Sequence, residues 1–309
     1  MAEPWRIGVV GLGKIARDQH VPALAASPSF RLVATADPAH ALPGVPAFAD
    51  FATLLAAGPA LDAVVVCTPP AVRVGLARKA LVAGLHVMLE KPPGRSAGQA
   101  APLRDLAAGR GRTLFAAWHS RAAGMVERAA EWLAGRALRS VEVVWRESID
   151  HWHPGQDWLL DQDGCGVFDP AINAFSILTR LLPDQPVVER ADLFVPANRA
   201  APAEARLVLR SGTAPVDCDF SLLEAGPQRW DIVVRTDRGL LELGAGGHRL
   251  RLAGQEQPIA HDAEYPQLYR RFAALIGAGA SDVDLAPQAL VDAALACGTM
   301  RRIAPFHFA

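Results

Sequence analysis

Short apolar runs without polar interruption recur through the first 120 residues, and segments of helical character separate them. Runs of this kind are typical of strands that are buried on both faces of a parallel sheet. The predicted strands are residues 6–10, 31–36, 61–67, 85–90 and 112–117, and the predicted helices are 51–57, 71–83 and 97–108. This alternation predicts a doubly wound parallel α/β domain over residues 1–120.

The pattern changes after residue 120, where a predicted helix over 122–133 leads into consecutive strands. The first strand, over 140–147, alternates in character, with Val141, Val143 and Trp145 on one side. Further strands are predicted at 187–195, 205–210, 216–223, 231–236 and 239–243, and a last helix, expected to pack on the first half, at 287–301. Residues 121–309 therefore form a predicted α+β domain with an open, mostly antiparallel sheet. Helices would cover one face of this sheet and a second subunit the other, which predicts a homo-oligomer (dimer or tetramer).

The composition is that of a globular protein of one large or two medium domains. The chain has 309 residues, of which 51% are hydrophobic and 20% are charged, enough to bury a core. Its net charge of -1 gives no electrostatic reason to expect nucleic acid or an anionic membrane as a partner. The four cysteines are widely separated, no apolar run reaches the roughly 18 residues of a membrane span, and no export signal is seen, so we expect a cytoplasmic protein.

A glycine-rich turn follows the first predicted strand. Gly11, Gly13 and Ala16 form the pattern G-x-G-x-x-A, with Lys14 and Ile15 between them. Gly11 would allow the tight turn, Gly13 would let the backbone approach a pyrophosphate, and Ala16 would let the next helix pack on the strand. The pattern predicts a Rossmann domain whose turn residues, Lys14 and Ile15 included, bind a nicotinamide dinucleotide.

The second predicted strand ends in Asp37, 21 residues after Ala16. A carboxylate at this place holds the ribose hydroxyls of the adenosine in dinucleotide-binding domains. Pro38, Ala39 and His40 follow it, so the chain offers no adjacent arginine to the 2′-phosphate of NADP. We therefore expect NAD as the preferred cofactor and NADP as the alternative. The structural alternative for Asp37 is a turn residue before proline.

Three more predicted strands end in residues that can carry chemistry: the turns 68–70 (Thr-Pro-Pro) and 90–92 (Glu-Lys-Pro), and the pair Trp118-His119. Ligands bind at the carboxyl ends of the strands in a doubly wound sheet, so these side chains should open onto one crevice with the glycine turn. The residues expected to contact the cofactor there are Thr68, Pro69, Glu90, Lys91 and His119.

Lys91 is unusual because the chain uses arginine almost everywhere else. Only Lys14, Lys79 and Lys91 are lysines among the 31 basic residues. Arginine cannot give up its proton in a protein, whereas a lysine can be tuned to do so. Lys91 is therefore a candidate for proton transfer. The alternative is a strand-terminal lysine held by solvent and Glu90.

In the second half, Asp169 and Asn173 lie four residues apart, so on a helix they would share one face. The structural alternative is that Asp169 caps the helix, with Pro170 at its first position, and that Asn173 is an exposed polar residue. His151 and His153 alternate on a neighbouring segment, predicted to be extended. Zinc needs three or four ligands at defined spacing, and nothing nearby completes a set, so no metal is expected.

Trp152 and Trp230 have two interpretations. They are core residues, or they form the wall of a sugar site, in which an indole ring lies under the C–H face of the sugar while polar groups bind its hydroxyls.

Three motifs together resemble the Gfo/Idh/MocA family of nicotinamide-dependent sugar oxidoreductases: Gly11-x-Gly13-x-x-Ala16, Glu90-Lys91-Pro92 and Gly164-x-Gly166-x-x-Asp169-x-x-x-Asn173. The resemblance covers essentially the whole chain. It is strongest to the 1-dehydrogenases of L-arabinose and D-galactose, through residues 14–20, 152–156 and 166–170. It implies a Rossmann domain, a second domain with an open sheet, and oligomerisation through that sheet.

The chain departs from the family pattern at two places. Much of the family has histidine where Asn173 stands, so histidine-base chemistry is not carried over; the sugar 1-dehydrogenases also lack that histidine. Some relatives have a serine-arginine pair near the position of Asp37 and accept NADP, and this chain does not.

The resemblance implies oxidation of a free aldopyranose at C1 to the aldonolactone, with hydride passing to the nicotinamide. Lys91 would be the proton acceptor or relay, with its pKa lowered by burial beside the cationic nicotinamide. Asp169 is the second acid/base candidate, and Asn173 would orient the sugar or that carboxylate. The expected substrate-binding residues are Lys91, His119, Glu147, Trp152, His153, Asp169, Asn173 and Trp230.

Two other functions stay open. One is a family dehydrogenase or reductase that acts on an inositol or related polyol with the same Lys91 and Asp169. The other is a non-catalytic nicotinamide-binding regulator. A regulator needs none of Lys91, Asp169 and Asn173, so their joint presence favours an enzyme.

Overall fold

The computed structural model describes residues 3–162, 164–258 and 264–308, and these divide into two compact units. The first unit contains the described residues up to His119 together with residues 264–285. The second unit contains the remaining described residues. Residues 264–285 lie far beyond the expected domain boundary at residue 120, yet they belong to the first unit.

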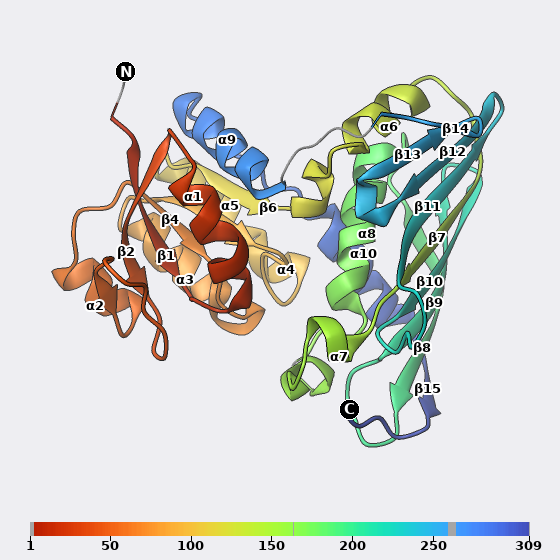
Figure 1. Ribbon diagram of the computed structural model, residues 1–309, viewed down its shortest axis with the longest axis horizontal. Coiled ribbons are helices and arrows are strands. Elements are labelled where there is room, and N and C mark those ends of the chain that lie inside the picture. Colours follow the sequence, from red (N-terminus) through yellow and green to blue (C-terminus); the bar gives the residue numbers. More distant parts are fainter. Residues whose placement is uncertain (1–2, 163, 259–263, 309) are drawn as a thin grey trace. The chain divides into compact units, whose positions relative to one another are not determined.

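The first unit is built on a six-stranded parallel sheet with the order β3-β2-β1-β4-β5-β6 (Figure 1). Its strands are β1 (Trp5–Val10), β2 (Phe30–Ala36), β3 (Ala47–Phe48), β4 (Ala63–Val66), β5 (His86–Glu90) and β6 (Leu114–Ala117). The order reverses between β1 and β4, and this switch point is where doubly wound sheets bind ligands. The predicted Rossmann sheet is confirmed, and β3 is an additional edge strand that the apolar pattern did not predict.

Apolar strands account for the core of this unit. All four residues of β4 are 0% exposed, and every residue of β5 is buried. Complete burial of this kind is what the unalternating apolar runs predicted.

Helices connect the strands of the first unit. They are a π-helical turn (Ala16–His20), α1 (Val21–Ala25), α2 (Phe51–Ala57), α3 (Pro70–Val82), α4 (Ala97–Ala100), α5 (Pro102–Gly109) and α9 (Glu264–Gly277). The helix predicted over 97–108 is therefore two helices, which divide at Ala101 immediately before Pro102. No helix was predicted over 264–277, where α9 packs against α1.

The second unit contains a nine-stranded sheet with the order β14-β13-β12-β11-β7-β10-β9-β8-β15. Its strands are β7 (Leu138–Arg146), β8 (Val187–Pro196), β9 (Glu204–Ser211), β10 (Ala214–Ser221), β11 (Arg229–Thr236), β12 (Gly239–Gly244), β13 (Arg249–Leu252), β14 (Gln255–Glu256) and β15 (Thr299–Ile303). Neighbours are antiparallel except for β7 with β10 and β8 with β15. The predicted mostly antiparallel sheet is confirmed.

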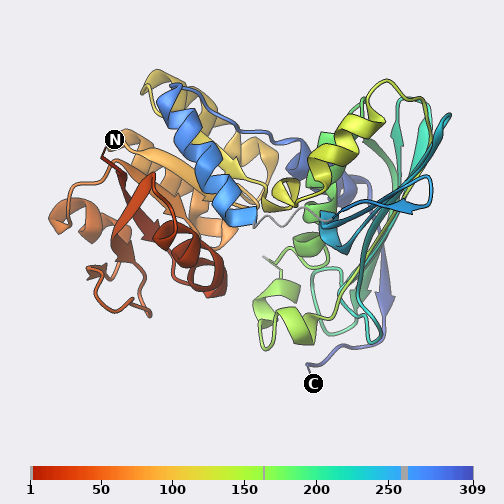
Figure 2. The same cartoon turned by 45° about the horizontal axis from the view of Figure 1, so that its top comes forward.

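Helices of the second unit lie against one face of this sheet, as Figures 1 and 2 show for α8 and α10. The helical segments are 3-10 turns at His119–Ala122, Asp157–Leu160 and Ala245–Gly247, and the helices α6 (Val126–Leu133), α7 (Ile149–Trp152), α8 (Phe168–Leu181) and α10 (Ala286–Cys297). Val141, Val143 and Trp145 of β7 are 4% exposed or less, in agreement with the predicted alternation.

The prediction for the last helix was wrong in two respects. It was expected to continue to residue 301, but α10 ends at Cys297, and residues 299–303 form β15. Residues 299–303 pair with β8, and Gly298 between the two elements leaves no room for a side chain, because a Cβ there would lie 2.5 Å from Cδ1 of Leu193 and 2.7 Å from the Ala294 carbonyl oxygen. The helix was also expected to pack on the first half of the chain, whereas α10 packs on α8 and β8 inside the second unit. In the described part of the chain, no helix is long and apolar enough to cross a bilayer.

Candidate active site

The glycine turn of the first unit has the conformation and the free space that a dinucleotide needs. Gly11 has a φ of +90°, and a Cβ there would lie 2.9 Å from the backbone nitrogen of Thr68, so only glycine fits. At Gly13 a Cβ would meet nothing within 4 Å, which leaves open space beside the backbone. Lys14 and Ile15 follow in the first helical turn. The Lys14 ammonium pairs with Asp18 at 2.5 Å, and Ile15 is 38% exposed.

Asp37 lies at the end of β2 with its carboxylate against the glycine turn. Oδ2 accepts a hydrogen bond from the Leu12 N–H at 2.8 Å, and Oδ1 accepts from the N–H groups of Ala39 and His40 at 2.9 Å. Burial raises the pKa of Asp37, but these hydrogen bonds lower it more, so the net pKa lies below its ordinary value. Asp37, the residue before Pro38, therefore stabilises the turn, as the structural alternative proposed. It is also an ionised carboxylate beside the glycine turn.

Thr68 and Pro69 continue the chain from β4 into α3. The Thr68 hydroxyl is buried, and Oγ1 has no hydrogen-bond partner among the described residues. A buried polar atom without a partner costs about 1–3 kcal/mol. This hydroxyl and the open space at Gly13 are therefore a good match for a bound dinucleotide.

Arg73 of α3 connects two strand ends. It is 4% exposed, and its guanidinium donates to the carbonyl oxygens of Thr68, Glu90 and Pro92. The bond to Glu90 measures 2.8 Å. Arg73 thereby holds the turns after β4 and β5 together, and no sequence motif predicted it.

Glu90 is a deeply buried carboxylate of the site. Its Oε1 lies 3.0 Å from Nε2 of His20 and accepts from the Tyr265 hydroxyl at 2.8 Å, while Oε2 accepts from the Lys91 N–H at 2.6 Å. Burial raises the pKa of Glu90, but its bond with His20 and the charges of His20, His119 and Arg73 lower it to about 2. The carboxylate is therefore ionised and bound by protein groups, directly before the half-buried Lys91.

His20 provides the other half of this buried pair. It lies in the π-helical turn after the glycine fingerprint, and its Nδ1 is 2.8 Å from the Tyr269 hydroxyl. Burial lowers the pKa of His20, whereas its interactions with Cys67, Tyr269 and Glu90 raise it well above its ordinary value. Because a carboxylate can only accept, Nε2 of His20 carries a proton.

His119 follows β6 and pairs with a helix from the distant part of the chain. Its Nδ1 lies 2.6 Å from Oε2 of Glu264 in α9, and its ring stacks on Tyr265. Its neighbour Trp118 was expected to open onto the ligand crevice. That expectation was wrong, because Trp118 is 4% exposed and donates its Nε1 proton to the Asp284 carbonyl at 2.9 Å.

In the second unit, α8 begins at Phe168, two residues earlier than the capping alternative for Asp169 requires. Val167 is the N-cap, and Asp169 lies in the first helical turn, so the capping role is wrong. Gly166 makes this start possible, since it has a φ of +53° and a Cβ there would lie 2.2 Å from the Pro202 carbonyl oxygen. The carboxylate of Asp169 is instead 3.5 Å from Nε2 of His153.

Asp169 and Asn173 are both half-buried on α8, where most of their neighbours are buried. His151 and His153 do not alternate on an extended segment as expected: His151 is in the short helix α7, and His153 follows its end. No cluster of three or more histidine, cysteine or acidic residues suited to a metal occurs in the described ranges.

A second group of candidates surrounds Trp230. The Trp230 Nε1 proton is donated to Oε2 of Glu147 at 2.8 Å, and the ring of Trp152 meets that of Trp230 edge to face at 5.9 Å. Trp152 also donates to Gln228 at 2.5 Å and remains 40% exposed. An exposed, hydrogen-bonded indole is unlike a core residue, so the core interpretation does not hold for Trp152.

The candidates therefore form groups inside each unit. The first unit brings together Gly11, Gly13, Lys14, Ile15, Asp37, Thr68, Pro69, Glu90, Lys91 and His119, and the second unit contains Glu147, Trp152, His153, Asp169, Asn173 and Trp230. The sequence reasoning missed Arg73, Tyr265, Tyr269 and Glu264 and gave His20 no role. His20 could have been identified, because it lies in residues 14–20, which carry part of the family resemblance. The residues of α9 could not, because that helix contains no recognised motif.

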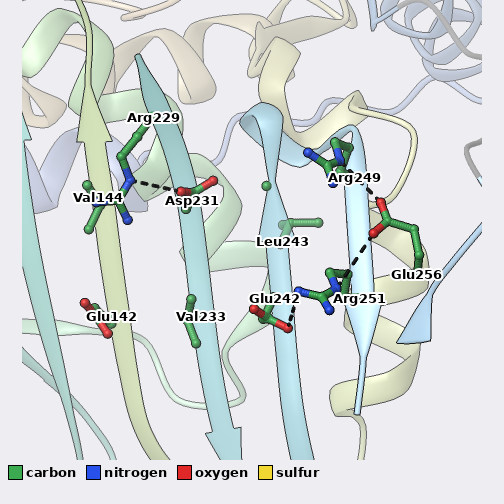
Figure 3. Close-up of a pocket in the computed structure, with 11 residues that line it drawn as sticks. Glu142, Val144, Arg229, Asp231, Val233, Glu242, Leu243, Arg249, Arg251 and Glu256 are labelled. Carbon is green, nitrogen blue, oxygen red and sulfur yellow. Dashed lines mark hydrogen bonds and ion pairs between the residues drawn. The ribbon is translucent and has the colours of Figure 1, made fainter. Parts of the chain in front are cut away.

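A pocket of about 240 Å³ lies elsewhere, on the outer face of the second sheet (Figure 3). Three ion pairs lie in its lining: Arg229 with Asp231 at 3.3 Å, Arg249 with Glu256 at 3.3 Å, and Arg251 with Glu242 at 3.5 Å. The lining contains none of the candidate site residues.

Comparisons with known proteins agree with this geometry. Residues 5–118 match the model of the Gfo/Idh/MocA oxidoreductase family, described as an NAD-binding Rossmann fold. The chain is 41% identical to a galactose 1-dehydrogenase of Pseudomonas fluorescens over 99% of both chains. A solved D-galactose-1-dehydrogenase from Rhizobium etli is 45% identical, with a TM-score of 0.94 over 99% of both chains. A 3-ketoreductase from Actinomadura kijaniata, solved with NADP and TDP-benzene, is 21% identical with a TM-score of 0.86 over 97% of this chain and 99% of its own. This last likeness is one of fold alone.

Proposed function

Because this chain belongs to the Gfo/Idh/MocA family of oxidoreductases, we propose that it is an aldose 1-dehydrogenase that oxidises D-galactose, or the related L-arabinose, at C1 to the aldonolactone. The observation that carries the proposal is the similarity to two galactose 1-dehydrogenases along the full length of the chain. The presence of Lys91, Asp169 and Asn173 supports it, since a protein that only bound nicotinamide would need none of them.

The first unit would hold the cofactor. Gly11 allows the tight turn against Thr68, Gly13 leaves room for the pyrophosphate, and the partnerless hydroxyl of Thr68 would gain a hydrogen bond. The ionised Asp37 would accept hydrogen bonds from the ribose hydroxyls. The same negative charge would repel a 2′-phosphate, so we propose NAD as the preferred cofactor.

The reaction removes one hydrogen from C1 of the pyranose, as hydride, and one from the anomeric hydroxyl, as a proton. The bound nicotinamide supplies the hydride acceptor for the hydrogen on C1. Lys91 takes the proton from the anomeric hydroxyl as the C1–O bond becomes a carbonyl. The buried Glu90 holds the Lys91 backbone N–H at 2.6 Å, and so fixes the start of the segment from which the amine extends.

Residues of the second unit would bind the sugar. Trp152 offers an exposed indole face for the C–H side of the pyranose, and Trp230 orients Glu147 for a hydroxyl. Asp169 is the second acid/base candidate, with His153 beside it at 3.5 Å and Asn173 one helical turn away. The outer face of the sheet would meet a second subunit, and the four free cysteines are in keeping with a cytoplasmic enzyme.

Galactose deuterated at C1 tests this proposal. If C1 is the site of oxidation, the reduced cofactor will contain the deuterium, and the sugar product will be a lactone without it. Deuterium retained in the sugar product would mean that another carbon is oxidised, as expected for an enzyme that acts on a ring hydroxyl of a polyol.

A further inference from the structure

Helix α9 brings a carboxylate to His119 from 145 residues away in the sequence. Oε2 of Glu264 is 2.6 Å from Nδ1 of His119, and the two side chains are 18% and 17% exposed. The pair is thus largely shielded from water, yet His119 keeps some access to a ligand.

Tyr265, the next residue of α9, packs against the face of the His119 ring. Tyr265 stacks on His119 with 5.7 Å between ring centroids and 17° between ring planes. The Tyr265 hydroxyl donates to Glu90, which in turn accepts from the Lys91 N–H. Glu264 and Tyr265 of α9 therefore hold Nδ1 and the plane of the His119 ring. Tyr265 also connects the ring, through Glu90, to the backbone of Lys91.

Among the described residues, charged groups of two elements act on His119. They are Glu264 of α9, and Glu90 and Lys91 at the end of β5. Burial lowers the pKa of His119 and so does Lys91, whereas Glu264 and Glu90 raise it, and the net pKa is above its ordinary value. Because the carboxylate accepts, Nδ1 carries a proton, and Nε2 is the ring nitrogen at which His119 gains or loses one.

A role limited to anchoring the helix would not require a histidine. Arginine makes some of the other contacts of residues 264–285: Arg271 pairs with Asp282 at 3.2 Å, and Arg104 donates to the Val283 carbonyl at 3.0 Å. An imidazole differs from these guanidinium groups because it can exchange a proton near neutral pH.

On the basis of the proposed function, we infer that Glu264 is a positioning residue for the sugar reaction. It holds the proton of His119 on Nδ1 and so presents Nε2 to the anomeric hydroxyl as a hydrogen-bond partner. The orienting carboxylate of a histidine–carboxylate pair acts in this way in other enzymes, where it fixes both the tautomer and the direction of the ring.

Histidine nitrogen NMR together with steady-state kinetics tests this inference. The samples are ¹⁵N-histidine-labelled wild type and Glu264→Gln, with His119→Gln to assign the signal. In wild type, neutral His119 should carry its proton on Nδ1; in Glu264→Gln the population with the proton on Nε2 should rise and the titration midpoint should fall. With galactose, kcat of Glu264→Gln should fall about 10- to 100-fold, while the KM for NAD should stay within about twofold.

Two further variants separate positioning from folding. Asp282→Asn removes a carboxylate that binds α9 through Arg271, and it should leave the His119 signal and the kinetics unchanged. Glu264→Asp keeps the charge and should recover part of the lost kcat. An unchanged His119 signal in Glu264→Gln, or a changed signal with normal kcat, would overturn the inference. If wild type oxidised no aldose at all, the proposed function would fail, while the tautomer of His119 would still report on the Glu264 contact.

Discussion

Nε2 of His20 lies 3.0 Å from Oε1 of Glu90, and the two side chains are 0% and 3% exposed. His20 belongs to the helical turn that follows the glycine fingerprint, and Glu90 directly precedes Lys91. The pair thus links the turn that would bind the cofactor to the residue that would take the proton. A buried pair of this kind adds little net stability, but it is costly to break because one charge is then left without its partner.

Glu90→Gln should destabilise the protein by about 3 kcal/mol near pH 6. The folded pKa of Glu90 is about 2, below its ordinary 4.5, so its contribution is present above about pH 4.5 and is lost as the pH falls toward 2. The raised pKa of His20 gives a contribution that is complete below about pH 6.5 and is lost as the pH rises through the folded pKa. Denaturant unfolding across this range measures both effects.

The control for this variant is Glu127→Gln, which breaks the exposed pair with Arg180 and should cost less than about 1 kcal/mol at any pH. A curve of stability against pH for Glu90→Gln that runs parallel to that of wild type would show that the pair does not couple folding to protonation.

Lys91→Arg should bind NAD nearly as wild type does but lose turnover by about 10²- to 10⁴-fold. Arginine keeps the charge but cannot accept a proton near neutral pH. Lys91→Met, which lacks the amine altogether, should do no better. The measurement is kcat at saturating sugar and NAD. If Lys91→Arg kept more than about a tenth of wild-type turnover, Lys91 would only place a charge, and Asp169 would become the base.

Asp37→Ala should narrow the preference for NAD over NADP. The substitution removes the negative charge that would face a 2′-phosphate, and it also removes the acceptor of the Leu12 N–H at 2.8 Å. The ratio of kcat/KM for the two cofactors is the quantity to compare. Equal efficiency of the wild-type enzyme with NAD and NADP would contradict the role given to this carboxylate.

Trp152→Ala should raise the KM for the sugar and leave the KM for NAD unchanged. The indole is 40% exposed, so its loss removes a surface for the sugar without opening the core. Trp158, which is 45% exposed in the same part of the chain and has no assigned role, provides the control as Trp158→Ala. Unfolding of Trp152→Ala, or loss of NAD binding with it, would favour a structural role.

The sequence was most informative where the physical signal is local. Apolar runs predict strands buried on both faces, and the glycine turn can be identified because the pattern G-x-G-x-x-A directly follows such a run. Lys91 could be found because its strand ends there and because lysine is rare in this chain. The predicted end of the last helix was wrong because residues 299–303 pair with the distant strand β8, and this contact is tertiary.

Partners that are distant in the sequence could not be predicted in the same way. The apolar positions Tyr265, Leu268, Tyr269 and Phe272 have helical spacing, so the existence of α9 was open to prediction. Nothing local indicates that α9 belongs to the first unit, or that Glu264 would meet His119. The same holds for Arg73, whose three carbonyl partners are brought together only by the sheet.

The central claim is that the protein oxidises free aldoses with NAD. Absorbance of NADH should be followed when the purified protein is mixed with NAD and a panel of D-galactose, L-arabinose, D-fucose, D-xylose and myo-inositol, with NADP in parallel. We predict NADH formation with D-galactose or L-arabinose at a kcat/KM of at least about 10⁴ M⁻¹s⁻¹, and a lower value with NADP. Absence of NADH with every aldose, or reduction of NAD by myo-inositol alone, would contradict the account.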